Sequence, residues 1–303
     1  MHIEPHPSRI ESPRSAPVVP ALEALLNQSM LRVEVVADEQ YCGSWFMDEP
    51  RYHCGLFHLV GTGECMIESA VLDEAWHLQA GDLVVLPHGD PHRLCARAGR
   101  EDIPTSLICG ELHLSSHAQH PLSFALPACF VVRAAQADTV FRHLSAMMVG
   151  VANSGTPGRQ VLLNKLADTL FTLAVCDYAN RNTDHQGLFA ALADSRICKV
   201  LQAVHEAPGR AWTMQSMASL ACMSRSAFAE RFAQLMKMPP MQYVTQWRVS
   251  IAERMLRERQ LSVASIAEQL GYSSEAAFRR LFKRISGICP GRIRQVSAER
   301  VLN

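Results

Sequence analysis

Cysteine offers the most chemistry in the first half of this 303-residue chain. Six of the ten cysteines lie there: Cys42, Cys54, Cys65, Cys95, Cys109 and Cys129. A strand in this region would put Arg93 and Arg97 on the same face as Cys95, where two cations favour the reactive thiolate. The alternative is that buried cysteines serve as small, inert apolar residues. Because the sequence shows no export signal, all are expected to be free thiols.

Three histidines offer a second chemistry. The imidazoles of His53, His58 and His92 would suit zinc or a similar ion if the fold brought them together. The alternative is that they are ordinary polar residues at strand ends, with His58 hydrogen-bonded in the interior. We therefore expect no obligatory cofactor, with a metal on these three histidines as the alternative.

Short apolar segments are the elements that would position these side chains. They cover residues 31–36, 56–60, 65–67, 83–86, 106–108 and 130–132. The residues that separate them include Gly61, Gly63, Gly81, Gly89 and Pro91. Many short strands with glycine turns are typical of a β-sandwich or a small barrel.

Two helices are predicted after these strands, within residues 140–151 and 161–178. Their apolar stripes consist of Leu144, Met147, Met148 and Val151, then Leu162, Leu163, Leu166, Leu170, Leu173 and Ala174. Such stripes suit a contact between two copies of the chain, or they cover an open side of the chain's own strands. Polar residues 180–186 follow and predict a flexible tether.

The last hundred or so residues contain one pattern twice. Ala218, Met223, Phe228 and Phe232 recur about fifty residues later as Ala267, Tyr272, Phe278 and Phe282. Each set predicts a short helix, a tight turn and a second helix. A longer helix over residues 241–257 is expected to connect them rigidly. The two second helices would then suit major-groove segments roughly 34 Å apart, which predicts DNA binding.

Charge divides the chain at the same place. From Arg196 onward there are 17 Lys or Arg against 7 Asp or Glu, whereas the residues before it hold 12 against 22. The net charge of zero therefore hides two parts of opposite charge: a cationic part suited to binding phosphate and an acidic part that would avoid nucleic acid. DNA affinity that falls steeply with salt is the expectation.

Residues from about Arg196 to Arg294 resemble the C-terminal DNA-binding domain of AraC/XylS-type transcription regulators. The segments that carry the resemblance are 216–218, 223–228, 266–267 and 271–275, with Arg248, Ala252, Phe278, Phe282 and Pro290. The resemblance implies base-facing positions at Arg225, Ser226, Glu230, Glu275, Ala276, Arg279 and Arg280. Lys283 and Arg284 are expected to contact phosphate. Since many members carry a basic residue where this chain has Glu230, the first unit is expected to contact fewer bases.

The spacing of Gly81, Pro87, Gly89 and His92 resembles the second sequence motif of cupin barrels, found as a sensor domain in one branch of AraC-family regulators. Cupin enzymes hold a metal through a first motif with two histidines and a glutamate. That motif is missing here, and Leu56 stands near the position of the carboxylate. Its absence argues against the competing class, a metal-dependent cupin oxygenase or isomerase joined to a DNA-binding module. An architectural DNA binder without an effector is a third class.

Segments 41–45, 107–112 and 170–175 resemble the reactive-chlorine-sensing regulators of that branch. The resemblance implies that Cys42 and Cys109 are the redox-active cysteines, and that oxidation favours the DNA-competent arrangement. A small-molecule effector, or none, is the alternative.

The sequence thus predicts an α+β multidomain protein: an N-terminal cupin-like β-barrel with a helical segment, and a C-terminal all-α domain with two helix-turn-helix units. The boundaries are a disordered leader at 1–20, the sensor barrel at 21–134, a helical dimerisation or packing segment at 135–179, a linker at 180–195, the DNA-binding domain at 196–296 and a tail at 297–303. We expect a cytoplasmic transcription activator rather than an enzyme. Its expected partners are double-stranded DNA, RNA polymerase, an effector and a second copy of the chain, but no membrane.

Overall fold

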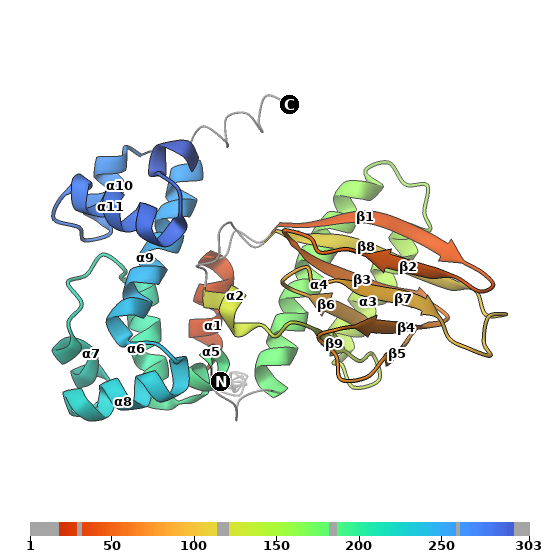
Figure 1. Ribbon diagram of the computed structural model, residues 1–303, viewed down its shortest axis with the longest axis horizontal. Coiled ribbons are helices and arrows are strands. Elements are labelled where there is room, and N and C mark those ends of the chain that lie inside the picture. The colour runs from red at the N-terminus through yellow and green to blue at the C-terminus, as the bar shows by residue number, and fades with distance from the viewer. Residues whose placement is uncertain (1–17, 29–31, 114–120, 182–186, 259–260, 294–303) are drawn as a thin grey trace, which may run out of the picture.

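The computed structural model describes residues 18–28, 32–113, 121–181, 187–258 and 261–293. Figure 1 shows a strand-rich part and an all-helical part side by side, with helices α3 (Thr139–Ala152) and α4 (Arg159–Arg181) along the strands. Among the described residues, helix α1 (Val18–Gln28) is followed by the strands, with one short helix before the last of them, and then by helices only. This order confirms the predicted α+β architecture.

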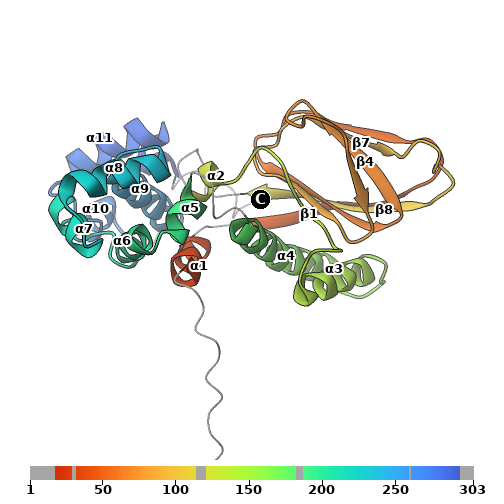
Figure 2. The same ribbon diagram turned by 90° about the horizontal axis from the view of Figure 1, so that it is seen from below.

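The strands form two antiparallel sheets that face each other (Figure 2). Their bounds are β1 (Arg32–Tyr41), β2 (Phe46–Glu49), β3 (Gly55–Thr62), β4 (Glu64–Ser69), β5 (Trp76–Gln79), β6 (Leu83–Leu86), β7 (His92–Ala96), β8 (Thr105–His113) and β9 (Phe130–Val132). One sheet has the order β1-β8-β3-β6-β9 and the other the order β2-β7-β4-β5. Buried side chains from both sheets, such as Val60, Ile67 and Leu107, fill the interior between them. A short helix, α2 (Pro121–Ala125), precedes β9.

Each predicted apolar segment falls in a strand, apart from residue 31, which lies outside the described residues. The strand predicted around Cys95 is β7. The pattern does not indicate β2 and β5, because neither contains a buried apolar run. Strand β2 forms by pairing with β7, which is distant in sequence, and β5 forms by pairing with the preceding strand β4.

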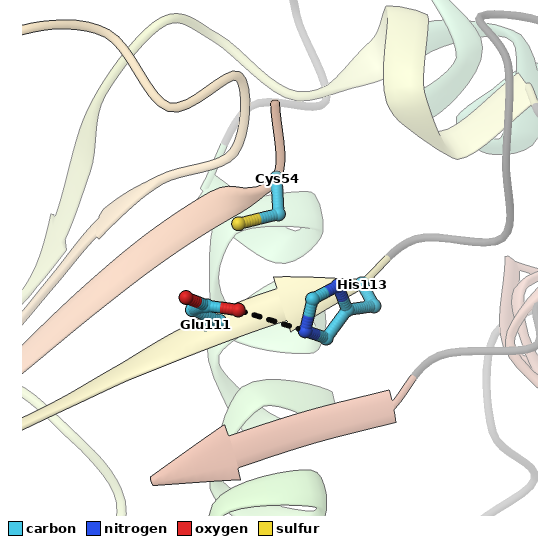
Figure 3. A group of neighbouring side chains, drawn as sticks. All are labelled: Cys54, Glu111 and His113. Carbon is cyan, nitrogen blue, oxygen red and sulfur yellow. Dashed lines mark ion pairs between the residues drawn. The ribbon is translucent and has the colours of Figure 1, made fainter. Parts of the chain in front are cut away.

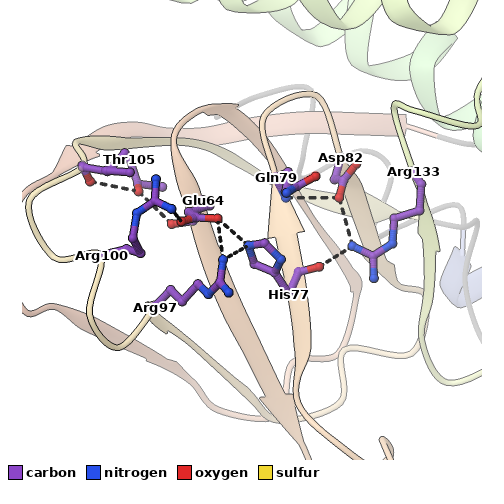
Figure 4. A network of polar contacts seen from close by, with 9 residues as sticks. Glu64, His77, Gln79, Asp82, Arg97, Arg100, Thr105 and Arg133 are labelled. Carbon is purple, nitrogen blue, oxygen red and sulfur yellow. Dashed lines mark hydrogen bonds and ion pairs between the residues drawn. The ribbon is translucent and has the colours of Figure 1, made fainter.

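Asp82 ties the turn of the predicted cupin motif to the end of the sheet. Its carboxylate accepts hydrogen bonds from the backbone N–H of Gln79, at 3.1 Å, and of Ala134, at 2.9 Å. Arg133 pairs with the same carboxylate at 2.9 Å (Figure 4). Gly81, which precedes Asp82, has φ +87°, a conformation that favours glycine. The turn between β5 and β6 is therefore held against the residues that follow β9.

Helix α4 covers the edge strand β1. Asp168 and Asn164 accept hydrogen bonds from the backbone N–H of Val33, at 2.8 Å, and of Val35, at 2.9 Å. Leu163 and Leu170 of α4 are buried in the same core as the outer side of this sheet. An uncovered edge strand would offer free N–H groups to another chain. The predicted helical segment thus packs on the chain's own strands, as one of the two interpretations expects.

Three predicted boundaries need correction. Residues 18–20 begin α1, so the leader cannot be wholly disordered, and residues 1–17 lie outside the described residues. Helix α1 packs against α5 (Leu188–Ala193) and α6 (Ser195–Glu206), so the segment predicted as barrel begins with a helix that contacts the helical part. The described residues of the predicted linker, 180–181 and 187–195, are largely helical, and the apolar side chains of α5 are buried; residues 182–186 lie outside the described residues.

The remaining helices are α7 (Met214–Leu220), α8 (Arg225–Met236), α9 (Pro240–Glu258), α10 (Val263–Gln269) and α11 (Glu275–Ser286). A hydroxyl side chain caps the start of four of them: Thr213, Ser224, Ser262 and Ser274. Each accepts from the backbone N–H three residues later, which satisfies a donor that the helix itself leaves free.

Candidate functional site

The two predicted helix-turn-helix units have the same turn geometry. The backbone N–H of Met223 donates to the carbonyl of Ala218 at 2.9 Å, and that of Tyr272 donates to Ala267 at the same distance. Cys222 and Gly271, one residue before each donor, both have positive φ, +53° and +74°. The left-handed residue reverses the chain between the two helices of each unit. The pattern that recurs in the sequence therefore recurs in the backbone.

Arg248 on the connecting helix α9 holds the two units together. Its Nε donates to the carbonyl of Pro208 at 2.7 Å, and its Nη2 to that of Arg210 at 2.8 Å. Its guanidinium also lies over the ring of Tyr272, 5.5 Å from the centroid. One side chain thus joins the loop before α7 to the turn before α11. Helix α9 covers the predicted residues 241–257 with one more at each end.

The predicted recognition helices α8 and α11 lie along one edge of the helical part, with α7 and α10 toward the opposite edge (Figure 2). Their inward faces bury Phe228, Phe232, Phe278 and Phe282. The predicted DNA-contacting residues with exposed side chains are Arg225, Ser226, Glu230, Ala276, Arg279, Arg280, Lys283 and Arg284. Glu275 is half-buried. The geometry therefore leaves the polar face of both helices accessible to a common ligand.

Two arginines on these helices already have carboxylate partners. Arg279 Nε donates to Glu275 at 2.6 Å, one turn away on α11. Arg231 Nε donates to Asp194 at 2.9 Å, and the carboxylate of Asp194 also caps α6. Arg231 therefore joins α8 to α6.

A chain of hydrogen bonds runs through the interior of the barrel. His58 on β3 and Cys109 on β8 are paired across the two strands, and Nδ1 of His58 lies 3.0 Å from Sγ of Cys109. Nε2 of His58 lies 2.7 Å from Nε2 of His92, whose Nδ1 lies 2.9 Å from the backbone carbonyl oxygen of Asp90. All four residues are buried. We call the side chains of Cys109, His58 and His92 the thiol–imidazole chain.

The last acceptor fixes the direction of every bond in this chain. A carbonyl oxygen can only accept, so Nδ1 of His92 carries a proton and, in the neutral ring, Nε2 accepts. Nε2 of His58 therefore donates to His92, which leaves Nδ1 of His58 without a proton. The thiol of Cys109 donates to that nitrogen. The arrangement gives a buried thiol a neutral base at hydrogen-bond distance.

Burial governs the ionisation of these groups. It lowers the pKa of His58 well below that of free imidazole, and His92 lowers it further. Burial also lowers the pKa of His92, against its hydrogen bond to Asp90. The pKa of Cys109 is raised far above its ordinary value by burial and by the carboxylates of Glu49 and Glu39. Before oxidation, the thiol–imidazole chain therefore consists of an uncharged thiol and two neutral imidazole rings.

The predicted reactivity of Cys95 is wrong. Burial and the carboxylate of Glu68 raise its pKa and outweigh the effect of Arg93. Arg93 forms a two-point ion pair with Asp48, with its Nε at 2.6 Å. Arg97 pairs with Glu64 at 3.1 Å, in a cluster that also holds His77 and Arg100 (Figure 4). Local sequence did not reveal these carboxylates, because they come from neighbouring strands.

Cys42 and Cys109 do not lie together. Cys42 is exposed and Cys109 is buried. Ala37 stands opposite Cys109 in the ladder between β1 and β8, and Cys42 lies five positions further along the chain, or about 16 Å at ordinary strand spacing. A disulfide needs Cα atoms within about 7 Å. The arrangement in this structure therefore excludes a direct bond between the two sulfurs.

The predicted three-histidine metal site is also wrong. His58 uses one ring nitrogen toward His92 and the other toward Cys109, whereas His53 is exposed in a bend. Within the described ranges, the residues that do gather three potential ligand atoms are Cys54, Glu111 and His113. No local pattern indicates Glu111 or His113 as ligands, because only the register of β3 against β8 brings them to Cys54.

Comparison with known proteins matches both parts of the chain. Residues 21–180 match a family model described as cupin, and residues 217–295 match one described as a helix-turn-helix domain. The chain is 31% identical over 242 residues to the RCS-specific HTH-type transcriptional activator RclR of Escherichia coli strain K12, covering 79% of this chain and 84% of that protein. It is 29% identical over 267 residues to the HTH-type transcriptional regulator AlkR of Acinetobacter baylyi, covering 79% and 86%.

Among solved structures, the DNA-binding domain of AdpA in complex with a target DNA is 30% identical, with a TM-score of 0.33, covering 34% of this chain and 93% of that one. In the part of the chain that the structure describes, no helix has the length and hydropathy needed to cross a bilayer.

Proposed function

Because the chain belongs to the AraC-like family of helix-turn-helix transcriptional regulators that carry a cupin domain, we propose that it is an activator switched on by oxidation of Cys109. The observation that carries this proposal is the thiol–imidazole chain, in which Cys109 lies 3.0 Å from a ring nitrogen of His58. RclR, a relative of this chain, is named as RCS-specific and as an activator. Hypochlorous acid is the oxidant that we assign to the site.

His58 accounts for how a thiol with a raised pKa can react. The sulfur of Cys109 attacks the chlorine of hypochlorous acid, so that an S–Cl bond forms and the Cl–O bond breaks. The thiol proton passes to Nδ1 of His58 and then to the departing hydroxide, which leaves as water. Hydrolysis of the S–Cl bond releases chloride and a proton and gives the sulfenic acid. The sulfur is oxidised by two electrons and the chlorine is reduced by two.

An aromatic contact series provides a route from the barrel to the DNA-binding helices. Phe130 of β9 lies 5.0 Å from Tyr178 of α4, measured between ring centroids, and Tyr178 lies 5.6 Å from Phe189 of α5. Gly187, just before α5, donates its backbone N–H to Leu235 of α8 at 2.7 Å. A polar sulfenic acid between β3 and β8 disturbs a tightly packed interior. We propose that this disturbance moves α4 and, through Tyr178, the first recognition helix.

Cys42 has a different role in this proposal. It is exposed and about 16 Å from Cys109 along the strands, so a bond between them requires the end of β1 to leave β8. Such a bond would follow oxidation of Cys109 and lock the rearranged strand. Reporter induction that starts normally and then decays in Cys42→Ala is the expected result.

We assign the DNA contacts to the exposed faces of α8 and α11. Arg225, Ser226 and Glu230 contact bases from the first unit. The second unit uses Glu275, Ala276, Arg279 and Arg280, with Lys283 and Arg284 on phosphate. Because Glu275 already holds Arg279, that pair is set in position before DNA binds. Glu230 disfavours phosphate, so the second unit contributes more to affinity.

Dimerisation and recruitment of RNA polymerase complete the proposed activator. On the outer side of α3 and α4, Val140, Met147, Val161 and Leu162 remain exposed, Met147 by 55% and Leu162 by 44%. The inner sides of both helices are occupied by the chain's own barrel. We propose that a second copy covers the exposed side chains. A Met147→Glu, Leu162→Glu protein that stays dimeric in light scattering would contradict this.

A cavity of about 360 Å³ supports a second candidate, a small-molecule effector. Trp76, Phe130 and Tyr178 line it, so an occupant would press directly on the aromatic contact series. Its cations Arg133 and Arg181 already pair with Asp82 and Asp177, which favours an uncharged aromatic ligand over an anion. Reporter induction by such a compound in Cys109→Ala would favour this candidate.

The decisive experiment compares Cys109→Ala with Cys65→Ala, a matched loss of a buried cysteine in the same interior. Cells carrying a promoter reporter are treated with hypochlorous acid. We expect Cys109→Ala to lose induction and Cys65→Ala to keep it. In purified protein, His58→Gln should slow sulfenic acid formation at Cys109, measured by mass spectrometry after dimedone trapping. Full induction in Cys109→Ala would refute oxidation as the signal.

A further inference from the structure

Three potential metal ligands meet where β3 begins and β8 ends. The ligand atoms of Cys54, Glu111 and His113 all lie within 4.8 Å of one another. Figure 3 shows the three side chains turned toward one another, Cys54 from just before β3 and the other two from the end of β8. We propose that they bind Zn²⁺, at a site separate from the thiol–imidazole chain.

The register of the sheet creates this arrangement. Gly55 pairs with Leu112, which places Cys54 opposite His113 across the ladder. Glu111 and His113 are two positions apart on β8 and therefore lie on the same face of the strand. The ladder between β3 and β8 holds the backbone of Cys54, one residue before β3, beside that of His113, so a cation needs only side-chain rotation to join the three ligands.

A metal cation at this cluster would take the place of the proton on the thiol of Cys54. The carboxylate of Glu111 lies 3.0 Å from Nε2 of His113. Burial and the nearby carboxylate of Glu111 raise the pKa of the Cys54 thiol, which therefore holds its proton. A divalent cation replaces that thiol proton, which leaves to solvent, and binds sulfur, nitrogen and oxygen at once. The side chains of His113 and Glu111 are 41% and 30% exposed, which leaves room for water as a fourth ligand.

The donor set selects the metal. Thiolate and imidazole suit Zn²⁺, whereas Mg²⁺ and Ca²⁺ require oxygen ligands. Three protein ligands with one open position make a tetrahedral zinc site. The thiol–imidazole chain cannot form such a metal site, because His58 directs one ring nitrogen toward Cys109 and the other toward His92.

Cobalt provides a direct test, since Co²⁺ bound to a thiolate absorbs in the near ultraviolet. Full-length protein is titrated with Co²⁺, followed by Zn²⁺ in competition. We expect a sulfur-to-cobalt band that Zn²⁺ removes, that Cys54→Ser lacks and that Cys109→Ala retains. His113→Gln should weaken Zn²⁺ binding by roughly tenfold or more, since losing even a supporting residue around a metal costs that much. A band that persists in Cys54→Ser, or that never appears, overturns the proposal.

Alkylation of the unmodified protein provides a second readout that needs no variant. Iodoacetamide is added with and without Zn²⁺, and the labelled cysteines are identified by mass spectrometry. We expect Zn²⁺ to protect Cys54, while exposed Cys42 is labelled at the same rate in both samples. Equal labelling of Cys54 in both samples contradicts the site. Neither readout depends on DNA binding or on oxidation of Cys109, so failure here leaves the proposed function standing.

Discussion

Gly209 and Gly271 meet backbone to backbone, so that a Cβ on Gly271 would collide with the carbonyl oxygen of Gly209. Gly209 lies in the loop before α7, and Gly271 forms the turn between α10 and α11. Arg248 holds the same loop from α9, through the carbonyls on either side of Gly209. The contact therefore joins the first helix-turn-helix unit directly to the second and sets the distance between the recognition helices.

The first prediction concerns Gly271. Gly271→Ala adds a Cβ where the backbone of Gly209 leaves no space and where φ is +74°. We expect the free energy of unfolding to fall by about 2 kcal/mol or more, measured by urea denaturation of the full-length protein. DNA affinity should fall as well, because the two units can no longer keep their spacing. Wild-type stability in this variant would show that the loop moves aside easily.

Cys222 supplies the matched control for this prediction. It occupies the corresponding turn of the first unit with φ +53°, which a residue with a side chain adopts at a cost. Cys222→Gly should therefore raise the free energy of unfolding by about 1 kcal/mol, the reverse of the effect at Gly271. Destabilisation by both substitutions would show that the two turns are not equivalent.

A second prediction separates base recognition from phosphate contact on α11. Arg280 and Lys283 are both exposed there. Arg280→Ala should weaken binding to the cognate promoter by about 1–3 kcal/mol and relax the preference at one base pair. Lys283→Ala should weaken cognate and random DNA alike and reduce the salt slope by about one. Fluorescence anisotropy over a salt series measures both effects. The assignment fails if Arg280→Ala weakens random DNA equally.

The sequence predicted the helical half well because its determinants are local. Caps such as Ser224 and Ser262, the turn at Gly271 and the inward phenylalanines act within a few residues of each other. The sensor chemistry was harder to predict, because strand register decides it. Cys109 acquires His58 as a partner across a ladder between positions 51 residues apart. The predicted reactivity of Cys95 is wrong for the same reason, because Glu64, Glu68 and Asp48 come from neighbouring strands.

A third prediction follows from the buried histidines. Burial lowers the pKa of His58 and His92 in the folded protein. As pH falls below about 6.5, the unfolded chain therefore binds more protons than the folded one, and the free energy of unfolding decreases. Urea denaturation at about pH 7.5 and about pH 5.5 should show this loss, and it should be smaller in His58→Gln, His92→Gln. The same change at exposed His143 is the control, and an equal reduction there would contradict the assignment.

The last prediction tests the aromatic contact series between barrel and recognition helix. The ring of Tyr178 touches Phe130 on one side and Phe189 on the other, so Tyr178→Ala removes both contacts while leaving the DNA surface intact. We expect this variant to bind promoter DNA and to form sulfenic acid at Cys109 as the wild type does, yet to lose most of its reporter induction by hypochlorous acid. Tyr178→Phe keeps both ring contacts and should retain more of the induction than Tyr178→Ala does. If Tyr178→Ala responds fully, the signal leaves the barrel by another path, and the contact of α1 with α5 and α6 becomes the next connection to test.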